Sequence, residues 1–221
     1  MGFFITLEGG EGVGKSTALS FIKNYFSQKN IDCVMTREPG GTKIGDAIRD
    51  VLLHHKDEMV LPETELLLLF AGRAQHITHI IKPALNVGKT VISDRFTDAS
   101  FAYQCGGRQV PVHYFDMLEK WIQGDLYPNL TLLLDAPVEV GMARIENRGD
   151  KDRIEQEKIE FFQRVREAYL ARAKQFPDRF VIIRANESLE SVQAQIKVAL
   201  DQSLQNRARS AQIGADMKKT E

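Results

Sequence analysis

The sequence predicts an α/β fold in which a doubly wound, five-stranded parallel sheet lies between two layers of helices. Five short apolar runs alternate with longer segments that have helical periodicity. Each short run is almost continuously hydrophobic, which is typical of parallel strands that helices cover on both faces. The chain has 221 residues, of which 43% are hydrophobic, so one such domain can bury a sizeable core.

Strands and helices alternate along the chain. The expected strands are Phe3–Glu8, Cys33–Arg37, Thr90–Asp94, Leu130–Asp135 and Arg179–Arg184. The expected helices are Lys15–Lys29, Lys43–His54, Glu63–Leu85, Val112–Gln123, Val138–Asn147, Glu155–Phe176 and Leu189–Leu204. Right-handed crossovers bring the carboxyl ends of the strands to one edge of the sheet, which is where ligands bind in such folds.

Two segments depart from this alternation. Residues of about 147–155 form a polar, charge-dense stretch between two helices, and we expect it to leave the core as a mobile loop. Residues 206–221 lose apolar periodicity, and we expect a frayed tail there. The chain is therefore predicted to form a single domain over residues 1–205.

Composition excludes several classes of function. The net charge of −1 creates no field that attracts nucleic acid or an anionic membrane, so neither is an expected partner. Cys33 and Cys105 are too few for a disulfide framework, and they indicate the cytoplasm. The longest apolar run, Leu66–Ala71, is too short to cross a bilayer. The five histidines have no accompanying cysteine or carboxylate motif, so a structural metal site is not expected.

A phosphate-binding loop follows the first strand. Its sequence is Gly9-Gly10-Glu11-Gly12-Val13-Gly14-Lys15-Ser16, which fits G-x-x-x-x-G-K-[ST] between a strand and a helix. Glycines allow backbone N–H groups to come close to phosphate oxygens. The Lys15 amine suits the β- and γ-phosphates of ATP, and the Ser16 hydroxyl suits Mg²⁺. We expect this loop, together with Thr17, to bind the ATP phosphates.

Such a loop also needs a carboxylate at the end of a neighbouring strand. Asp94 and Asp135 both end predicted strands. Asp94 is the preferred Mg²⁺ partner, because its strand is expected beside the first one. Asp135 remains open, since it can equally cap the helix that follows Pro137.

Other parts of the sequence indicate which class of phosphate-loop protein this is. No N-K-x-D string is present, which argues against a GTPase switch. Arg37 ends the second predicted strand, Arg95 follows the third, and further arginines lie in the polar stretch, as in kinases of small phosphorylated molecules. A kinase of another nucleotide or deoxynucleoside, or a protein that senses a nucleotide without transferring phosphate, remains an alternative.

Several strings in the chain resemble those of the bacterial thymidylate kinases. They are, in order, Thr36-Arg37-Glu38-Pro39-Gly40-Gly41-Thr42, Phe70-Ala-Gly-Arg73-Ala-Gln-His76, Asp94-Arg95-Phe96, Ala102-Tyr103-Gln104 and Asp152-Arg153-Ile154-Glu155. With the phosphate loop, the resemblance extends to about residue 204. It implies a P-loop NTPase fold of the nucleoside monophosphate kinase type, with three α/β/α layers. It also implies transfer of the γ-phosphoryl of ATP to dTMP with Mg²⁺, and a homodimer.

The resemblance also implies roles for individual residues. The dTMP site would comprise Glu11, Arg37, Phe70, Arg73, Arg95, Ser100, Tyr103 and Gln104. Phe70 and Arg73 are three apart on one helix face and could offer a base an aromatic ring and a forked donor. The family's usual aromatic lies four residues before the arginine, where this chain has Leu69. Phe96 stands where a tyrosine is common.

The expected catalytic cations are Lys15, Arg95 and Arg153. The resemblance is to members that supply an arginine from a lid, here residues 147–155, because the phosphate loop itself contains none. Arg153 is the first candidate and Arg148 the second, with Arg148 and Arg144 included among the ATP-binding residues. Arg144 is expected beside adenine, and Glu11 near the 3′-hydroxyl of dTMP.

Overall fold

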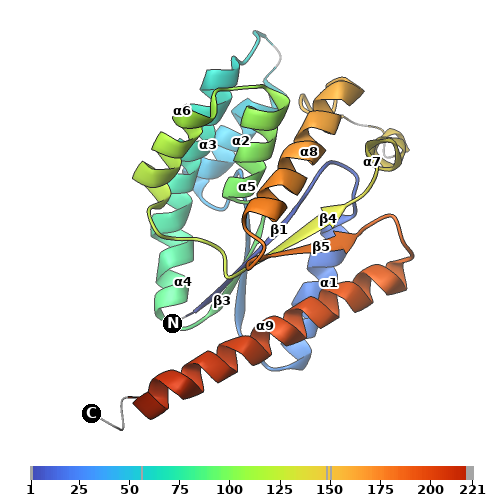
Figure 1. Ribbon diagram of the computed structural model, residues 1–221. Coiled ribbons are helices and arrows are strands. Elements are labelled where there is room, and N and C mark those ends of the chain that lie inside the picture. Colours follow the sequence, from blue (N-terminus) through green and yellow to red (C-terminus); the bar gives the residue numbers. More distant parts are fainter. Residues whose placement is uncertain (1, 56, 148, 150, 218–221) are drawn as a thin grey trace.

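A computed structural model describes residues 2–55, 57–147, 149 and 151–217, with side chains as far as residue 209. The sheet contains five parallel strands in the order β2-β3-β1-β4-β5 (Figure 1). The strands are β1 (Phe3–Gly9), β2 (Cys33–Arg37), β3 (Thr90–Asp94), β4 (Leu130–Asp135) and β5 (Phe180–Arg184). Each lies within one residue of its predicted bounds, which confirms the doubly wound parallel sheet.

Helices cover both faces of this sheet. The α-helices are α1 (Lys15–Gln28), α2 (Lys43–His54), α3 (Pro62–His76), α4 (Lys82–Asn86), α5 (Thr97–Ser100), α6 (Val112–Leu118), α7 (Val138–Glu146), α8 (Ile159–Gln175) and α9 (Leu189–Met217). Three π-helical segments continue α3, α5 and α6, namely η1 (Ile77–Ile81), η2 (Phe101–Gly107) and η3 (Glu119–Gln123). No helix among the described residues is both long and apolar enough to span a membrane.

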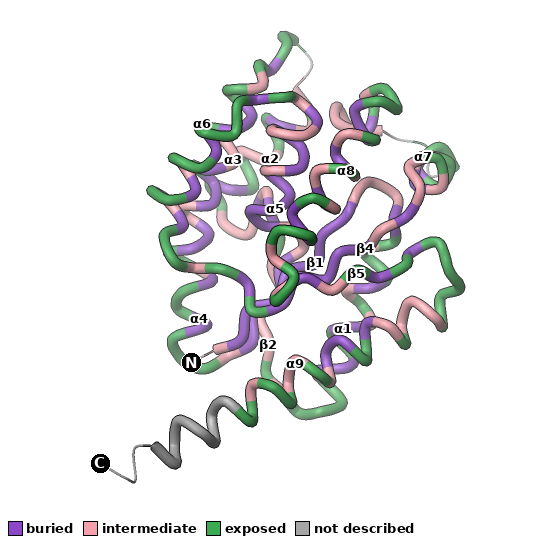
Figure 2. The backbone as a smooth tube through the Cα atoms, viewed as in Figure 1, coloured by how far each residue is buried: buried purple, intermediate pink, exposed green. Residues whose placement is uncertain are grey.

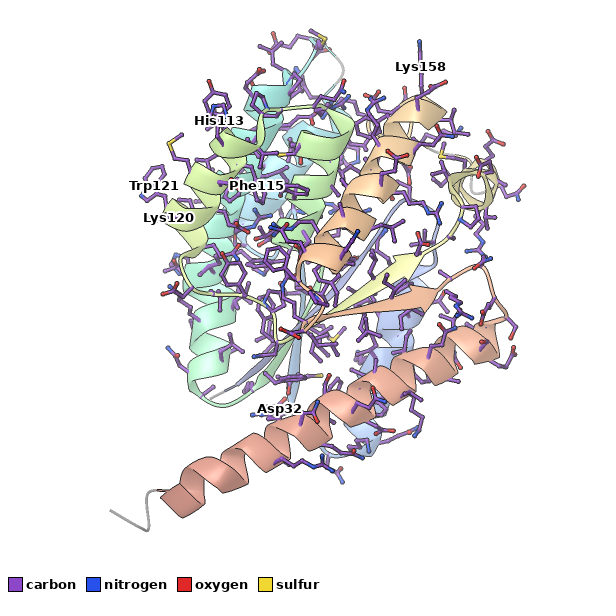
Figure 3. All side chains as sticks on the ribbon, viewed as in Figure 1. Asp32, His113, Phe115, Lys120, Trp121 and Lys158 are labelled. Atoms are coloured by element: carbon purple, nitrogen blue, oxygen red, sulfur yellow. The ribbon has the colours of Figure 1, made fainter. Side chains whose placement is uncertain are left out.

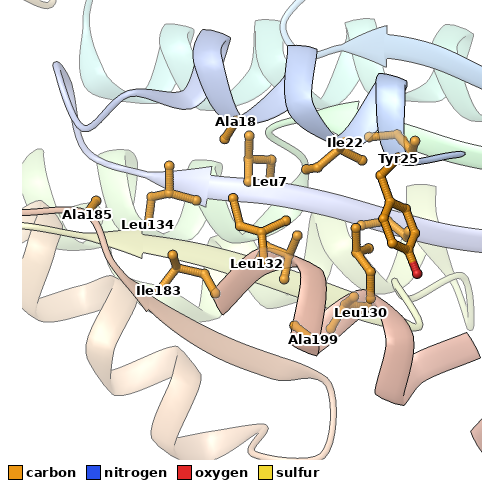
Figure 4. Packing of buried hydrophobic residues seen from close by; sticks show 14 of the residues in the cluster. Leu7, Ala18, Ile22, Tyr25, Leu130, Leu132, Leu134, Ile183, Ala185 and Ala199 are labelled. Carbon is orange, nitrogen blue, oxygen red and sulfur yellow. The ribbon is translucent and has the colours of Figure 1, made fainter. Parts of the chain in front are cut away.

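Side chains of the central strands alternate between two hydrophobic layers. Ile5 and Leu7 of β1 belong to one hydrophobic cluster with Ile22 of α1 and Ile196 of α9. Figure 4 shows Leu7 and Ile22 within this cluster. Phe4 faces the opposite layer and packs edge-on against Phe96. Because successive strand residues point to opposite faces, apolar runs such as FFITL supply both cores at once. Figure 2 shows the resulting buried centre and the exposed outer surfaces of the helices.

Two helix boundaries differ from the predicted ones by more than one residue. Helix α8 begins at Ile159 rather than Glu155. The residues before Ile159 form a turn instead of a helix. The Oδ1 of Asp152 closes this turn by accepting the N–H groups of Ile154 and Glu155 at 2.9 Å each. Helix α9 continues to Met217, beyond Leu204, where the apolar periodicity ends.

Candidate active site

A cavity of about 900 Å³ opens at the carboxyl edge of the sheet. The phosphate loop and the end of β3 form its floor, while α2, α3 and η2 form the wall on the other side. Residues 151–155 of the predicted lid also line it. The cavity thus joins segments that are far apart in the sequence, including most of the predicted site residues.

The phosphate loop leaves a helix start open to an anion. Gly14 precedes α1 with a left-handed φ of 95°, and no side chain in the described structure caps the helix. The first N–H groups of α1 therefore remain available to phosphate oxygens. Gly12 is required by packing as well as by its φ of 67°, because a Cβ there would overlap the carbonyl oxygen of Gly141 in α7.

Lys15 folds back over this loop. Its Nζ donates to the carbonyl oxygens of Gly10 at 2.6 Å and Gly9 at 3.2 Å. Burial, followed by the nearby charge of Arg95, lowers the pKa of Lys15 to about 8. Ser16, the next residue, also lines the cavity, whereas Thr17 is exposed and is not among its described lining residues.

Arg95 is held in place by several groups at the cavity floor. Its Nη2 donates to Glu11 Oε1 at 2.6 Å, and its Nη1 donates to the Gly9 carbonyl at 3.1 Å and to the Tyr169 hydroxyl at 3.2 Å. The Tyr103 hydroxyl donates to the same Glu11 oxygen at 2.7 Å. Burial opposes the charge of Arg95, but the ion pair with Glu11 raises its pKa further above the usual range. The acid in the phosphate loop is thus compensated by Arg95.

Glu8 and Tyr169 support Arg95 and were not predicted from the sequence. Arg95 has a left-handed φ of 65°, which is unfavourable for a side chain other than glycine. The Glu8 carboxylate accepts the next backbone N–H, that of Phe96, at 2.8 Å and the Tyr169 hydroxyl at 2.9 Å. Burial, and then the charge of Asp98, raises the pKa of Glu8 to about 8. Phe96 itself is fully buried and packs edge-on against Phe4.

The structure separates the two candidate carboxylates for Mg²⁺. Both β3 and β4 lie beside β1, so strand adjacency alone does not choose between them. Asp135 is occupied by Arg166, which donates to both of its oxygens at 2.7 and 2.9 Å. Asp94 lines the cavity, and its buried Oδ1 has no hydrogen-bond partner among the described residues. Asp94 therefore fits a cation better than Asp135.

A buried polar chain fixes Arg73 in the cavity wall. Arg73 Nε donates to Glu38 Oε2 and Nη2 donates to Ser100 Oγ, both at 2.8 Å. His76 Nδ1 lies 2.8 Å from Glu38 Oε1, and its Nε2 lies 2.6 Å from Thr36 Oγ1. Arg73 Nη1 is buried without a hydrogen-bond partner in the described part of the chain. One donor of a rigid guanidinium therefore remains for a ligand.

Phe70 does not lie at the cavity, so we no longer expect it to stack on a base. Its side chain is 1% exposed and packs edge-on against Phe115. Its ring supports Arg73, whose guanidinium carbon lies 4.6 Å from the ring centroid. Leu69 lines the cavity instead. The one-residue difference from the family pattern thus places an aliphatic side chain where the aromatic ring was expected.

Arg49, which the sequence reading missed, lies closer to the cavity than Arg37. Arg37 is exposed, pairs with Asp46 at 3.4 Å and is not among the described cavity-lining residues. Arg49 of α2 lines the cavity and donates to the Pro39 carbonyl at 3.1 Å. Burial, and then the charges of Arg37 and Arg95, lowers the pKa of Arg49. A site this electropositive favours an anion.

The lid arginine contacts the wall opposite the phosphate loop. Arg153 donates from Nε to the Leu52 carbonyl at 2.8 Å, and its Nη2 lies 2.7 Å from Glu65 Oε1. Its backbone N–H also donates to the Leu53 carbonyl, so the lid is bound to the last turn of α2. Arg148 lies outside the described residues.

Gln104 lines the cavity, whereas Arg144 is not among its described lining residues. Gln104 Nε2 donates to Glu65 Oε2 at 3.0 Å, and its Oε1 is buried without a hydrogen-bond partner in the described structure. Arg144 of α7 is exposed and donates to the Gly12 carbonyl at 3.2 Å, behind the phosphate loop.

Comparison with known proteins agrees with this geometry. A family model described as thymidylate kinase matches residues 7–196. The chain is 53% identical over 199 residues to a thymidylate kinase of Vesicomyosocius okutanii, covering 90% of this chain and 97% of the relative. It is 51% identical over 199 residues to a thymidylate kinase of Pseudomonas putida, covering 90% and 95%.

A solved structure supports the same assignment. The crystal structure of thymidylate kinase from Ehrlichia chaffeensis superposes with a TM-score of 0.74 at 32% identity, covering 90% of this chain and 98% of that one. The chain therefore belongs to the thymidylate kinase family, whose members are ATP:dTMP phosphotransferases.

Proposed function

We propose that the two substrates bind on opposite sides of this cleft for transfer of the γ-phosphoryl of ATP to dTMP. The phosphate loop binds ATP, and the cavity wall formed by α2, α3 and η2 binds dTMP. The main support for the dTMP site comes from two buried polar atoms that have no hydrogen-bond partner in the described structure. They are the donor Arg73 Nη1 and the acceptor Gln104 Oε1. Both residues line the cavity.

This donor–acceptor pair suits the edge of thymine. The imide edge of thymine offers a carbonyl oxygen beside an N–H group, and these complement Arg73 and Gln104. Cytosine has an amino group and an unprotonated nitrogen at the same edge. Its amino group would face the donor of Arg73, and its nitrogen would face the acceptor of Gln104, so neither hydrogen bond could form. Leaving such buried groups unpaired costs about 1–3 kcal/mol each, which favours thymine.

The sugar and the acceptor phosphate occupy the space between the base and the phosphate loop. We assign Tyr103 to the deoxyribose, where its ring excludes a 2′-hydroxyl, and Glu11 to the 3′-hydroxyl. Tyr103 and Glu11 already share a hydrogen bond of 2.7 Å, which supports one combined site. Arg95 and Arg49 are assigned to the acceptor phosphate, because both line the cavity and carry the required charge.

The donor set also suits Mg²⁺. The buried, partnerless Asp94 Oδ1 and the Ser16 hydroxyl are oxygen ligands of the kind that Mg²⁺ prefers. Among the described residues no three His, Cys, Asp or Glu side chains form a group that could hold a metal ion, so ATP oxygens and water would have to complete the shell. The ion would neutralise charge on the β- and γ-phosphates.

The side chains need to position the two substrates and to neutralise the charge on the phosphates, and none of them has to form a covalent bond with the phosphoryl group. A phosphate oxygen of dTMP attacks the γ-phosphorus in line, and ADP leaves. Lys15 and Arg95 hold positive charge at the phosphate loop, and Arg153 would add charge when the lid closes. Closure would also exclude water, which limits hydrolysis of ATP. Arg144 is assigned to the adenine side of the loop.

We further propose a homodimer in the cytoplasm. The dimer is expected from the family, and the chain offers a suitable surface. Tyr114, Met117 and Trp121 share one exposed face of the continuous α6–η3 helix, where Trp121 is 77% exposed and points outward (Figure 3). Cys33 and Cys105 are both free thiols, in keeping with a reducing compartment. Analytical ultracentrifugation of wild type and Trp121→Glu tests the dimer.

A panel of acceptors tests the substrate assignment. Thymidine, dTMP, dUMP and dCMP are each offered with ATP and Mg²⁺, and kcat/KM is measured from ADP release. The cleft chemistry predicts that dTMP exceeds dCMP by about 100-fold or more, from two mismatched buried groups. A preference for dCMP or for thymidine would show that the chain is a kinase of another acceptor.

A further inference from the structure

Glu65 lies where the base-binding wall meets the lid. It is on α3, and its side chain is 1% exposed. Its Oε2 accepts from Gln104 Nε2 at 3.0 Å and from Arg108 Nε at 3.1 Å. Its Oε1 lies 2.7 Å from Arg153 Nη2 and 3.0 Å from Arg108 Nη2. One carboxylate therefore contacts both the amide assigned to the base and the arginine of the lid.

The two oxygens of Glu65 are engaged in different ways. The contacts of Oε2 with Gln104 and Arg108 have hydrogen-bond geometry. The contacts of Oε1 with Arg108 and Arg153 are equally short, but their angles do not align as hydrogen bonds. Charge attraction without alignment tolerates movement better than a directional bond does. The oxygen on the lid side can thus exchange partners while the other one keeps the amide in place.

The bond to Glu65 also sets the orientation of Gln104. A carboxylate only accepts hydrogen bonds, so the amide must turn its NH₂ group toward Glu65. The oxygen of Gln104 then has to face away, where it is buried without a partner in the described structure. This is the atom to which we assign the N–H group of thymine. Without the charge of Glu65, either face of the amide could point to the base.

We infer that Glu65 is a positioning residue that couples recognition of the pyrimidine base to the position of the lid arginine. The inference rests on the proposed binding of thymine at Gln104. A base that donates its N–H group to Gln104 Oε1 orders the amide and strengthens the Gln104–Glu65 bond, and this changes the attraction that Glu65 exerts on Arg153. Since coupling between sites is reciprocal, a change at the lid arginine must also alter the preference for the base.

The test compares Glu65→Gln with Glu63→Gln, an exposed neighbour on the same helix. Gln at position 65 keeps the size of the side chain but removes its charge and can offer NH₂ to Gln104. Affinities for dTMP and dCMP are measured by calorimetry without ATP, and lid exposure by the rate of tryptic cleavage after Arg153. In wild type and Glu63→Gln, dTMP is expected to change the cleavage rate.

In Glu65→Gln, the ratio of dTMP to dCMP affinity should fall about tenfold. Addition of dTMP should also no longer change the cleavage rate. A ratio and a dTMP response both equal to those of Glu63→Gln would overturn the inference. A wild-type protein that binds dCMP as tightly as dTMP would instead contradict the proposed function, so the two failures are distinguishable.

A second variant covers the case in which Glu65→Gln does not fold. Arg153→Gln changes a side chain at the cavity rim that is 20% exposed. Binding is again measured without ATP, so the proposed role of Arg153 in transfer does not enter. Reciprocal coupling predicts a change in the dTMP to dCMP affinity ratio of about threefold or more. An unchanged ratio would show that base recognition and the lid are independent.

Discussion

The lowered pKa of Lys15 gives ATP binding a measurable proton linkage. In the free protein this pKa is about 8, because burial and the charge of Arg95 disfavour the cation. About half of the Lys15 amines are therefore neutral at about pH 8. A bound triphosphate brings negative charge to the amine and raises its pKa toward the ordinary value of 10.5. ATP binding at about pH 8 should then take up about half a proton per chain.

Calorimetry measures this uptake directly. A non-hydrolysable ATP analogue is titrated at the same pH in two buffers with different ionisation enthalpies, and the difference in heat gives the number of protons. At about pH 6 the part of the uptake that is due to Lys15, which is the difference between wild type and Lys15→Ala, should be close to zero, because the amine is already charged. Glu8 also has a pKa of about 8, so Lys15→Ala is the necessary control. Absence of uptake at pH 8 in the wild type, or equal uptake in Lys15→Ala, would refute the reasoning.

Four substitutions test other groups in and around the cleft. Asp94→Asn should lower kcat about 100-fold and raise the Mg²⁺ concentration for half-maximal activity, because it neutralises the proposed ligand; an unchanged Mg²⁺ requirement would contradict this. Arg49→Gln should raise the KM for dTMP about tenfold, because it removes a charge assigned to the acceptor phosphate, and Arg37→Gln should raise it much less. If steady-state kinetics show the reverse, Arg37 rather than Arg49 binds that phosphate. Because burial raises the pKa of Glu8 from 4.5 to about 8, protonation of Glu8 favours the folded chain, and this contribution falls as pH rises from about 4.5 to about 8. Glu8→Gln should therefore flatten the dependence of Tm on pH in this range, and an equally steep curve would contradict this.

The sheet could be predicted closely because its strands are local patterns. Apolar runs covered on both faces leave a clear signal, and all five strands appear within one residue of their expected bounds. The phosphate loop was equally clear, since its glycines, Lys15 and Ser16 are contiguous. The end of α9 was less predictable, because its last turns extend past the apolar residues that marked the helix. A stretch without periodicity gives no local signal for where a helix stops.

Within the site, the errors come from contacts that join distant segments. Leu69 and Phe70 both lie near the face of Arg73 in the sequence pattern, and only the packing of Phe115 against Phe70 shows which one enters the core. Arg49 carries no motif, and it reaches the cavity from α2, where it also donates to the Pro39 carbonyl. The sequence around Glu65 contains no motif either, although Glu65 pairs with Arg153 of the lid, 88 residues later in the chain.

The central claim is that a donor site and an acceptor site share this one cleft. The most direct test measures ADP release from ATP with and without dTMP, together with the amount of dTDP formed. If both sites lie in the cleft, dTMP should accelerate ADP release by about 100-fold or more, and one dTDP should appear for each ADP. ADP release that is independent of dTMP, or nucleotide binding with no dTDP formed, would contradict it.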